Sequence, residues 1–292
     1  MRISRRSVLC GGAAAALLGG CSGHTNPLAG RKLRLVRITS HQAVVLELDG
    51  SSAAPRFTQF ELGGYTGAWD IAGGRMFFAL PNTAMPDSRI LAMTPSGHVE
   101  REAHSSGWIS RVAASIDGRD IALLTRSTAG GTVQIRRFRF ETGKSEVLTT
   151  RLMPPHQAAG SAHPSLAWSK EKSLLAYCDH GVIDLIHDTD GTTVDQLDGA
   201  FARFSSTGRL AYAQSEAVCV REPDGQTRRI IRDRKLLGIH GWLSDGKTVL
   251  ISERISAIKP HHYARWTLLN VENGTDFQLP FGEVPHHLVL NG

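Results

Sequence analysis

Trp242-Leu243-Ser244-Asp245-Gly246-Lys247-Thr248-Val249-Leu250-Ile251 combines an aromatic residue, a Ser-Asp-Gly turn and an apolar run rich in β-branched residues. This order predicts a β-hairpin, because Asp and Gly tolerate the positive φ angles that reverse the chain between two strands. Variants of the phrase recur along the chain, so the sequence is a repeat array. The other copies run over 69–78, 114–123, 168–177 and 204–212, and their turn residues aligned with Gly246 are Gly73, Gly118, Lys172 and Gly208.

Each repeat also contains a second turn further along the chain. Two turns per repeat predict four short strands, named A to D from the inside outward, and no stretch has the periodicity of an amphipathic helix. A four-stranded antiparallel unit repeated about every 44 residues is typical of a propeller blade. The second turns are Leu48-Asp49-Gly50, Pro95-Ser96-Gly97, Glu141-Thr142-Gly143-Lys144, Thr189-Asp190-Gly191, Pro223-Asp224-Gly225 and Glu272-Asn273-Gly274.

The two ends of the chain complete one blade. The first repeat has candidates for strand B (33–38), strand C (44–48) and strand D (57–62), but nothing before them supplies strand A. The carboxyl-terminal stretch 287–292 reads as an inner strand ending in Asn-Gly. We therefore predict an all-β fold, a single six-bladed propeller over residues 33–292, closed by the carboxyl-terminal strand in the first blade.

Residues 1–20 have the parts of an export signal: basic residues from Arg2 to Arg6, a weakly apolar stretch and small residues before Cys21. Ser4-Arg5-Arg6-Ser7-Val8-Leu9 resembles the twin-arginine pattern, and Leu18-Gly19-Gly20-Cys21 resembles the lipobox of bacterial lipoproteins. The second resemblance implies that Cys21 is lipidated and that residues 21–32 tether the body to a membrane facing the periplasm. Ser22 would permit sorting to the outer membrane of a Gram-negative host. A chance Cys in a simple secretory signal is the alternative, and the export route stays open.

Composition limits the class of partner. The chain has 292 residues and a formal net charge of +6, which falls to +3 if Arg2, Arg5 and Arg6 leave with the signal. That charge is small, and no basic run with interleaved aromatic residues occurs, so we predict no nucleic-acid binding. No apolar run outside the amino terminus is long enough to span a bilayer. Cys178 and Cys219 are interpreted as two buried thiols, although an oxidising compartment permits a disulfide between them.

The repeats resemble those of the TolB-like propeller family, whose unit reads Trp-Ser-Pro-Asp-Gly-Lys. The residues that carry this likeness are Trp168-Ser169, Trp242, Asp117-Gly118 and Asp245-Gly246-Lys247. The family resemblance, also described as WD40-like, covers the whole body of the chain. Two departures stand out: the Pro of the unit is replaced in every copy, and the α/β domain that precedes the propeller in TolB is absent from this sequence.

The connections of such a propeller fall on two faces. The A-to-B and C-to-D turns lie on one, here called the turn face; the B-to-C loops and D-to-A crossings lie on the other, the loop face. Loops on a rigid scaffold commonly carry binding, so we assign function to the loop face. The long segments 81–88, 127–131, 150–163 and 253–265 map there, as do ten of the 13 histidines: His41, His104, His156, His163, His180, His240, His261, His262, His286 and His287.

Five histidines are candidates for ligand or partner binding: His163, His240, His261, His262 and His286. His163, His240 and His286 come at the starts of inner strands, and imidazoles there could hold a divalent metal. This arrangement resembles the oligogalacturonate lyases, which use propellers with TolB-like repeats and a His-rich metal centre. The spacings match no metal motif, and histidines also serve as ordinary hydrogen-bonding residues in loops.

The predicted function is an exported, lipid-anchored and monomeric binding module of the bacterial cell envelope, without catalysis or a cofactor. Its partner is an envelope protein, a peptide or a glycan. The alternative is a metal-assisted polysaccharide lyase or hydrolase at a His-lined mouth. Trp69, Trp168 and Trp242 could be read as sugar-stacking platforms, but their shared position at the end of strand A favours packing between blades.

Overall fold

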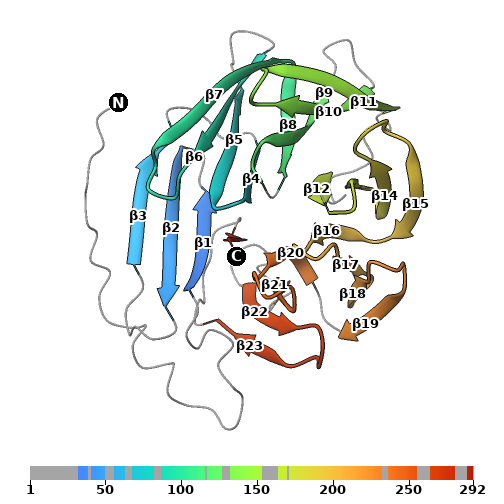
Figure 1. The fold of residues 1–292 in the computed structure, drawn as a ribbon. Coiled ribbons are helices and arrows are strands. Elements are labelled where there is room, and N and C mark those ends of the chain that lie inside the picture. The colour runs from blue at the N-terminus through green and yellow to red at the C-terminus, as the bar shows by residue number, and fades with distance from the viewer. Residues whose placement is uncertain are drawn as a thin grey trace.

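A computed structural model describes residues 32–38, 41–49, 56–62, 68–81, 87–115, 117–126, 132–152, 164–169, 171–231, 236–254, 264–279 and 288–291. Their strands form six four-stranded antiparallel sheets set around a common axis (Figure 1). The predicted all-β, six-bladed propeller is confirmed. No helix among these residues is long and apolar enough to cross a membrane.

The strands follow one another from the inside of each blade outward, except in blade 1, whose inner strand comes from the carboxyl terminus. Blade 1 consists of β24 (Leu288–Asn291), β1 (Lys32–Ile38), β2 (Gln42–Asp49) and β3 (Arg56–Glu61). Blade 2 consists of β4 (Ala68–Ala72), β5 (Arg75–Pro81), β6 (Asp87–Met93) and β7 (Val99–Ser106). Blade 3 consists of β8 (Trp108–Ala114), β9 (Asp120–Arg126), β10 (Thr132–Arg139) and β11 (Lys144–Leu152). Blade 4 consists of β12 (Ser165–Ser169), β13 (Leu174–Asp179), β14 (Val182–His187) and β15 (Thr193–Asp198). Blade 5 consists of β16 (Ala200–Phe204), β17 (Leu210–Gln214), β18 (Ala217–Arg221) and β19 (Thr227–Ile231). Blade 6 consists of β20 (Leu236–Trp242), β21 (Thr248–Arg254), β22 (Ala264–Asn270) and β23 (Asp276–Gln278).

The ring is closed as predicted. β24 pairs with β1 in an antiparallel register that joins Arg34 to Asn291 and Arg37 to Leu288. Apolar side chains of blade 1, including Leu33 and Leu35, share a buried cluster with those of blade 6, such as Leu250. The first and last blades therefore meet both through backbone pairing and through a core.

The core of the molecule is divided into six clusters, one at each junction between neighbouring blades. Strand β9 shows why: Ile121 and Leu123 point to blade 2, whereas Ala122 and Leu124 point to blade 4. Successive side chains of a strand lie on opposite faces of the sheet, so a blade between two neighbours is apolar on both. This explains the near-continuous apolar runs of the middle strands.

The structure of the A-to-B turns explains why the turn sequence recurs in each repeat. Its Ser or Asp side chain accepts hydrogen bonds from backbone N–H groups of the turn. Ser205 Oγ accepts from Arg209 at 3.0 Å, and Asp245 Oδ1 accepts from Lys247 at 2.8 Å. Glycine supplies the positive φ in most copies, but in blade 4 the positive φ falls on Ser173 and not on the aligned Lys172.

Several strands are longer than the sequence predicted. In blade 6, Glu253 pairs with Arg265 and Arg254 pairs with Ala264, so the strands extend into the expected loop 253–265. Backbone pairing tolerates polar side chains at strand ends, which hydrophobic pattern alone does not reveal. Cys178 and Cys219 are free and buried, as predicted, and both belong to the cluster between blades 4 and 5.

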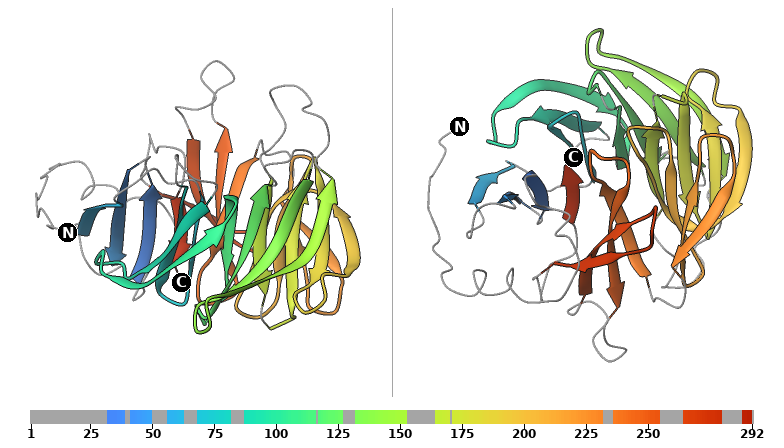
Figure 2. Two further views of the ribbon diagram at one scale, coloured as in Figure 1. Left: turned by 90° about the horizontal axis from the view of Figure 1, so that it is seen from above. Right: turned by 60° about the horizontal axis from the view of Figure 1, so that its bottom comes forward.

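The predicted packing role of the tryptophans is also confirmed. Trp168 and Trp242 are buried between blades, and each indole N–H donates at 2.9 Å, to Asp188 and to the carbonyl of Arg203 respectively. Trp69 packs against the cluster between blades 1 and 2. In the side view of Figure 2 the strands run between two ends of the ring, and these ends are the turn face and the loop face.

Candidate functional site

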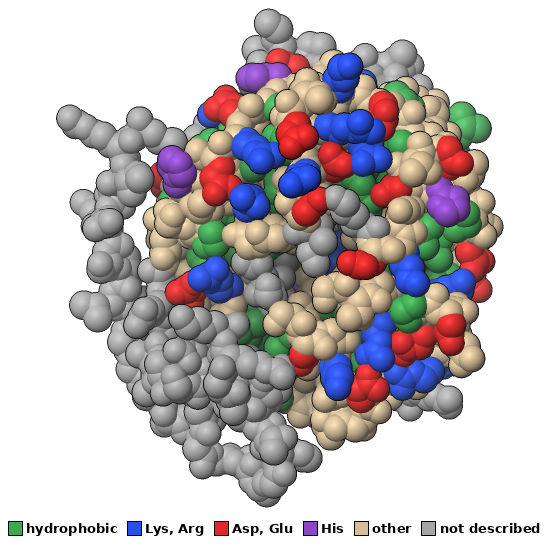
Figure 3. All heavy atoms as spheres, in the orientation of Figure 1, with side chains coloured by type: hydrophobic (Ala, Val, Ile, Leu, Met, Phe, Trp, Pro, Cys, Tyr) green, Lys and Arg blue, Asp and Glu red, His purple; other side chains and the backbone are tan. Residues whose placement is uncertain are grey.

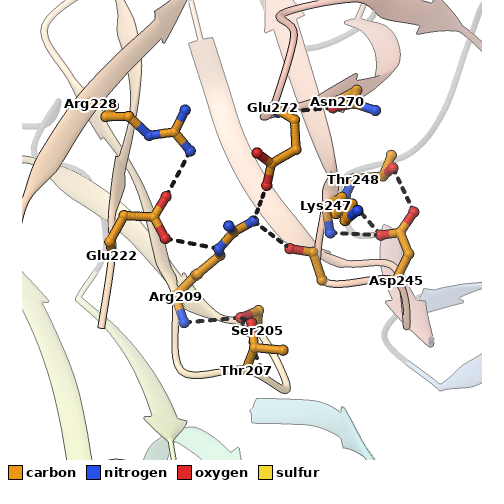
Figure 4. A network of polar contacts seen from close by, with 11 residues as sticks. Ser205, Thr207, Arg209, Glu222, Arg228, Asp245, Lys247, Thr248, Asn270 and Glu272 are labelled. Atoms are coloured by element: carbon orange, nitrogen blue, oxygen red, sulfur yellow. Dashed lines mark hydrogen bonds and ion pairs between the residues drawn. The ribbon is translucent and has the colours of Figure 1, made fainter. Parts of the chain in front are cut away.

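On the turn face, charged side chains pair with one another. Arg209 contacts Glu222 at 2.9 Å and Glu272 at 2.5 Å, and it donates to the carbonyl of Gly246 at 3.2 Å (Figure 4). Arg228 contacts Glu222 at 2.7 Å. Basic and acidic groups lie interspersed on this face in Figure 3. Groups that neutralise each other in this way leave little charge to recognise a ligand.

The loop face contains a cavity of about 260 Å³ between blades 4 and 5. Its walls are the crossing Asp198–Phe201, the β17–β18 hairpin residues Ala213–Ser215, Gly181 and Leu236. Gly199 brings the crossing against β17: a Cβ there would lie 2.6 Å from the carbonyl oxygen of Ala213. The cavity is mostly lined by small and apolar residues, which suits an apolar side chain of a ligand.

The backbone around this cavity is strained. Four non-glycine residues in the described part of the chain have positive φ, and three of them line the cavity or adjoin it: His180 at 49°, Phe201 at 58° and Ser215 at 54°. The pairing of β16 with β17 also shifts register between Ala200 and Arg203. Such conformations cost about 1–3 kcal/mol each and cluster at functional sites, which makes this region a candidate.

Two arginines approach the inner strand β12 from the blades on either side of it. Arg111 of β8 donates from Nε to the carbonyl of Pro164 at 2.5 Å. Arg203 of β16 donates from Nη1 to the carbonyl of Leu166 at 3.1 Å. These carbonyls lie at the loop-face end of β12, so both guanidinium groups are brought to the same end of the inner strands. Both side chains are half-buried.

The electrostatics of this pair are dominated by positive charge. Burial lowers the pKa of Arg111, and the charges of Arg126 and Arg203 lower it further. No carboxylate forms an ion pair with Arg111, Arg126 or Arg203 within the described ranges. Burial raises the pKa of Asp70 above its ordinary value, although the charge of Arg203 and a hydrogen bond from the backbone N–H of Ala114 oppose that shift. The region therefore holds three guanidinium groups and one carboxyl whose ionisation is disfavoured.

An exposed aromatic residue lies beside the arginines. Trp108 begins β8 at the loop face, and 51% of its surface is exposed, although large aromatic residues usually pack inside. It is the cross-strand partner of Arg126. Tryptophan and arginine are the residues most enriched at the energetic centres of protein interfaces. Their juxtaposition here adds a contact surface to the charge.

Of the histidines proposed from the sequence, the structure describes His240. Its Nε2 lies 2.7 Å from Ser252 Oγ, and its ring packs against Trp266 with centroids 4.5 Å apart. This is the environment of a packed, hydrogen-bonded histidine. His163, His261, His262 and His286 lie outside the described residues, as does Cys21. Within the described part of the chain, no group of three or more His, Cys, Asp or Glu residues could hold a metal ion.

The sequence reading missed Trp108, Arg111 and Arg203. One signal was available: Arg111 stands in the middle of an inner strand that reads Trp-Ile-Ser-Arg-Val-Ala-Ala, where a charged residue is unexpected. Nothing in the sequence indicated that Arg203, from another blade, would approach the same strand. Chemically, the group can bind an anion and an apolar side chain next to it, since guanidinium groups donate to carboxylate or phosphate oxygens.

The fold is similar to that of several solved β-propeller structures. No protein-family model and no curated protein matches the chain. Among solved structures, the chain is similar to TolB from Acinetobacter baumannii, with 12% sequence identity over 92% of this chain and 68% of that one, at a TM-score of 0.59. A chain of the nidogen/laminin complex matches over 88% of this chain and 98% of its own, at 9% identity and a TM-score of 0.58.

A third similar structure is the Swd1 β-propeller domain from Myceliophteria thermophila, with 10% identity, coverage of 86% and 88%, and a TM-score of 0.51. At these identities the likeness establishes the fold, in which sequences differ widely while the blade packing is kept. The chain is thus a six-bladed β-propeller similar to that of TolB.

Proposed function

We propose that this protein is an exported, lipid-anchored propeller that binds an envelope protein, a peptide or a glycan through its loop face. One observation carries the proposal: the two faces differ. The turn face pairs its charges, while the loop face presents the cavity, Trp108 and arginines that form no ion pair with a carboxylate among the residues that the structure describes. Exposed apolar surface and unpaired charge on a rigid scaffold are features of binding sites.

The fold supports the same function. Propellers present loops of variable sequence on a closed, rigid ring, and one similar structure is a chain of the nidogen/laminin protein complex. Export and anchoring are proposed from the sequence of residues 1–21, with lipid attached to Cys21. A protein with one lipid chain binds a membrane only marginally, whereas a protein with two or more is stably anchored. An amino terminus that carries two or more lipid chains would therefore keep the propeller at the membrane.

The test is partner capture from solubilised envelope membranes. In the variant, residues 255–263 are replaced by Asn-Gly. This loop leaves from Arg254 and returns at Ala264, which are cross-strand partners, and a two-residue Asn-Gly turn fits such a pair. We expect the variant to melt at the wild-type temperature and to lose the partner. The matched control is Arg139→Gln on the turn face, which should retain it.

Retention of the partner by the loop variant, together with its loss in the control, would contradict the assignment of function to the loop face. A Cys21→Ser variant that stays with the membrane fraction would contradict the lipid anchor. The lyase or hydrolase alternative is tested separately, by measuring the metal content of the untagged wild-type protein. One divalent ion per chain would favour that enzyme over the binding module.

A further inference from the structure

The side chains of Arg111 and Arg203 have hydrogen-bonding capacity beyond what the fold uses. In the described part of the chain, Arg203 makes one side-chain hydrogen bond, to Leu166, and its buried Nε has no partner. Among the described residues, Arg111 donates to the carbonyls of Pro164 and Ser110 alone. A guanidinium group has five N–H donors, and backbone carbonyls do not neutralise its charge.

The surroundings strengthen the preference for an anion. Arg126 is exposed at the end of β9, and its side chain forms no hydrogen bond or ion pair within the described residues. Arg111 and Arg203, from blades 3 and 5, therefore reach the loop-face end of β12, and Arg126 is close enough to Arg111 for its charge to lower the pKa of that side chain. The one carboxyl placed near them is that of Asp70, whose pKa the charge of Arg203 lowers, but burial disfavours its ionisation, so it offsets only part of the repulsion between the guanidinium groups.

Apolar features on the same strands as the arginines indicate what kind of molecule carries the anion. Phe201 lines the cavity and is separated from Arg203 by one residue of β16, while Trp108 is exposed next to Arg126. A peptide offers a carboxylate and an apolar side chain a few ångströms apart. A free inorganic anion would leave the cavity and the indole unused. A polysaccharide would not match a cavity of about 260 Å³ whose walls are mainly Gly, Ala, Phe and Leu, with Asp198, Gln214 and Ser215 among them.

We propose that Arg111 and Arg203 form a binding site for a carboxylate of an acidic peptide segment, and that the adjoining cavity accepts an apolar side chain of the same segment. The inference rests on the proposed function, since it names the chemistry of the partner. Arg126 adds long-range attraction, and Trp108 contributes contact area at the edge of the site.

The probe is an acetylated and amidated hexaglutamate peptide, titrated into the full chain in detergent at low salt and followed by calorimetry. Hexaglutamine, inorganic phosphate and an oligogalacturonate of similar length are the comparison ligands. We expect hexaglutamate to bind, hexaglutamine not to bind, and the affinity to fall as salt is added. Arg111→Gln and Arg203→Gln should each weaken hexaglutamate by about tenfold.

Two variants separate ligand binding from folding. Arg126→Gln should weaken hexaglutamate by about threefold with an unchanged melting temperature, because its side chain is exposed. Arg119→Gln removes an equal charge from the turn face and should leave binding unchanged. Failure of hexaglutamate to bind, equal weakening by Arg119→Gln, or tighter binding of phosphate or oligogalacturonate would each overturn the inference.

Capture from envelope membranes distinguishes this failure from failure of the proposed function. If wild type and Arg111→Gln/Arg203→Gln capture the same partner equally well, the proposed function stands and the anion site is wrong. If wild type captures nothing, the proposed function fails, and the hexaglutamate titration still decides whether the site binds a carboxylate.

Discussion

The turn face and the loop face lie at opposite ends of the same strands but differ in their connections and in their charge pairing. On the turn face, connections are short, hold themselves together with Ser, Asp and Gly, and pair their charges, as Arg209 does with Glu222 and Glu272. On the loop face, the backbone is strained at Phe201 and Ser215, the indole of Trp108 is exposed, and Arg111, Arg126 and Arg203 form no ion pair with a carboxylate within the described ranges. We therefore expect stability to depend most on the turns that the sequence repeats, and binding to depend on the loops that differ between blades.

The largest expected effect tests this contrast with two glycines of similar φ. Gly191 on the turn face has φ 73°, and a Cβ there would lie 1.9 Å from the carbonyl oxygen of Leu148 in the neighbouring blade. Gly181 on the loop face has φ 80°, and nothing lies within 4 Å of its Cβ position. We expect Gly191→Ala to lower the free energy of unfolding by about 3 kcal/mol or more, and Gly181→Ala by about 1 kcal/mol.

Urea denaturation of both variants measures the difference. If Gly191→Ala were as stable as Gly181→Ala, the backbone at the junction between blades 3 and 4 would be able to shift and accommodate the added Cβ at little cost. The turn face would then be no more tightly packed than the loop face.

A smaller effect is expected from the ion network. Arg209→Gln removes the partner of both Glu222 and Glu272, and we expect a loss of about 1 kcal/mol at neutral pH, limited by the solvent exposure of Glu272. Arg139→Gln is the control, because its pair with Glu146 is long and about half exposed. It should cost less than about 0.5 kcal/mol.

The same network predicts a pH dependence. The hydrogen bond from Arg209 is the largest cause that lowers the pKa of Glu272 below its ordinary value of 4.5. A lowered pKa in the folded state means that the pair stabilises the protein above pH 4.5 and that this stability is lost as the pH falls through the folded-state pKa. Thermal melts between pH 7 and pH 3 should therefore decline less steeply for Arg209→Gln than for wild type. Parallel curves would contradict the role of the network.

The smallest effect on stability is expected at Trp108. Because the side chain is 51% exposed, Trp108→Ala should change the free energy of unfolding by less than about 0.5 kcal/mol. The same change should weaken capture of the envelope partner, since the indole would form part of the contact surface. A clear drop in melting temperature with capture unaffected would make Trp108 a packing residue and weaken the distinction between the faces.

The fold could be predicted well because its signals are local. Each Ser-x-x-Gly or Asp-Gly turn, such as Asp245-Gly246, reverses the chain through contacts within a few residues. Strand ends were harder: Glu253 and Arg265 pair across β21 and β22 although both are charged. The shift of positive φ to Ser173 was also hidden, because a turn can move by one residue without changing its composition.

The site could not be predicted in the same way. The sequence favoured histidines in loops. In the structure His240 is bonded to Ser252, and Arg111 and Arg203 carry charges that form no ion pair within the described part of the chain. Those two arginines belong to blades 3 and 5 and meet on either side of β12 in blade 4.

Blade number, strand order and the joining of the two ends were readable along the chain, because hydrophobic alternation and turn chemistry depend on near neighbours. The convergence of Arg111 with Arg203, the cavity between blades 4 and 5 and the exposure of Trp108 could not be read along the chain. They depend on how three separate blades are arranged about one axis and on the register shifts in the pairing of β8 and β16, and residues far apart in the sequence determine that arrangement.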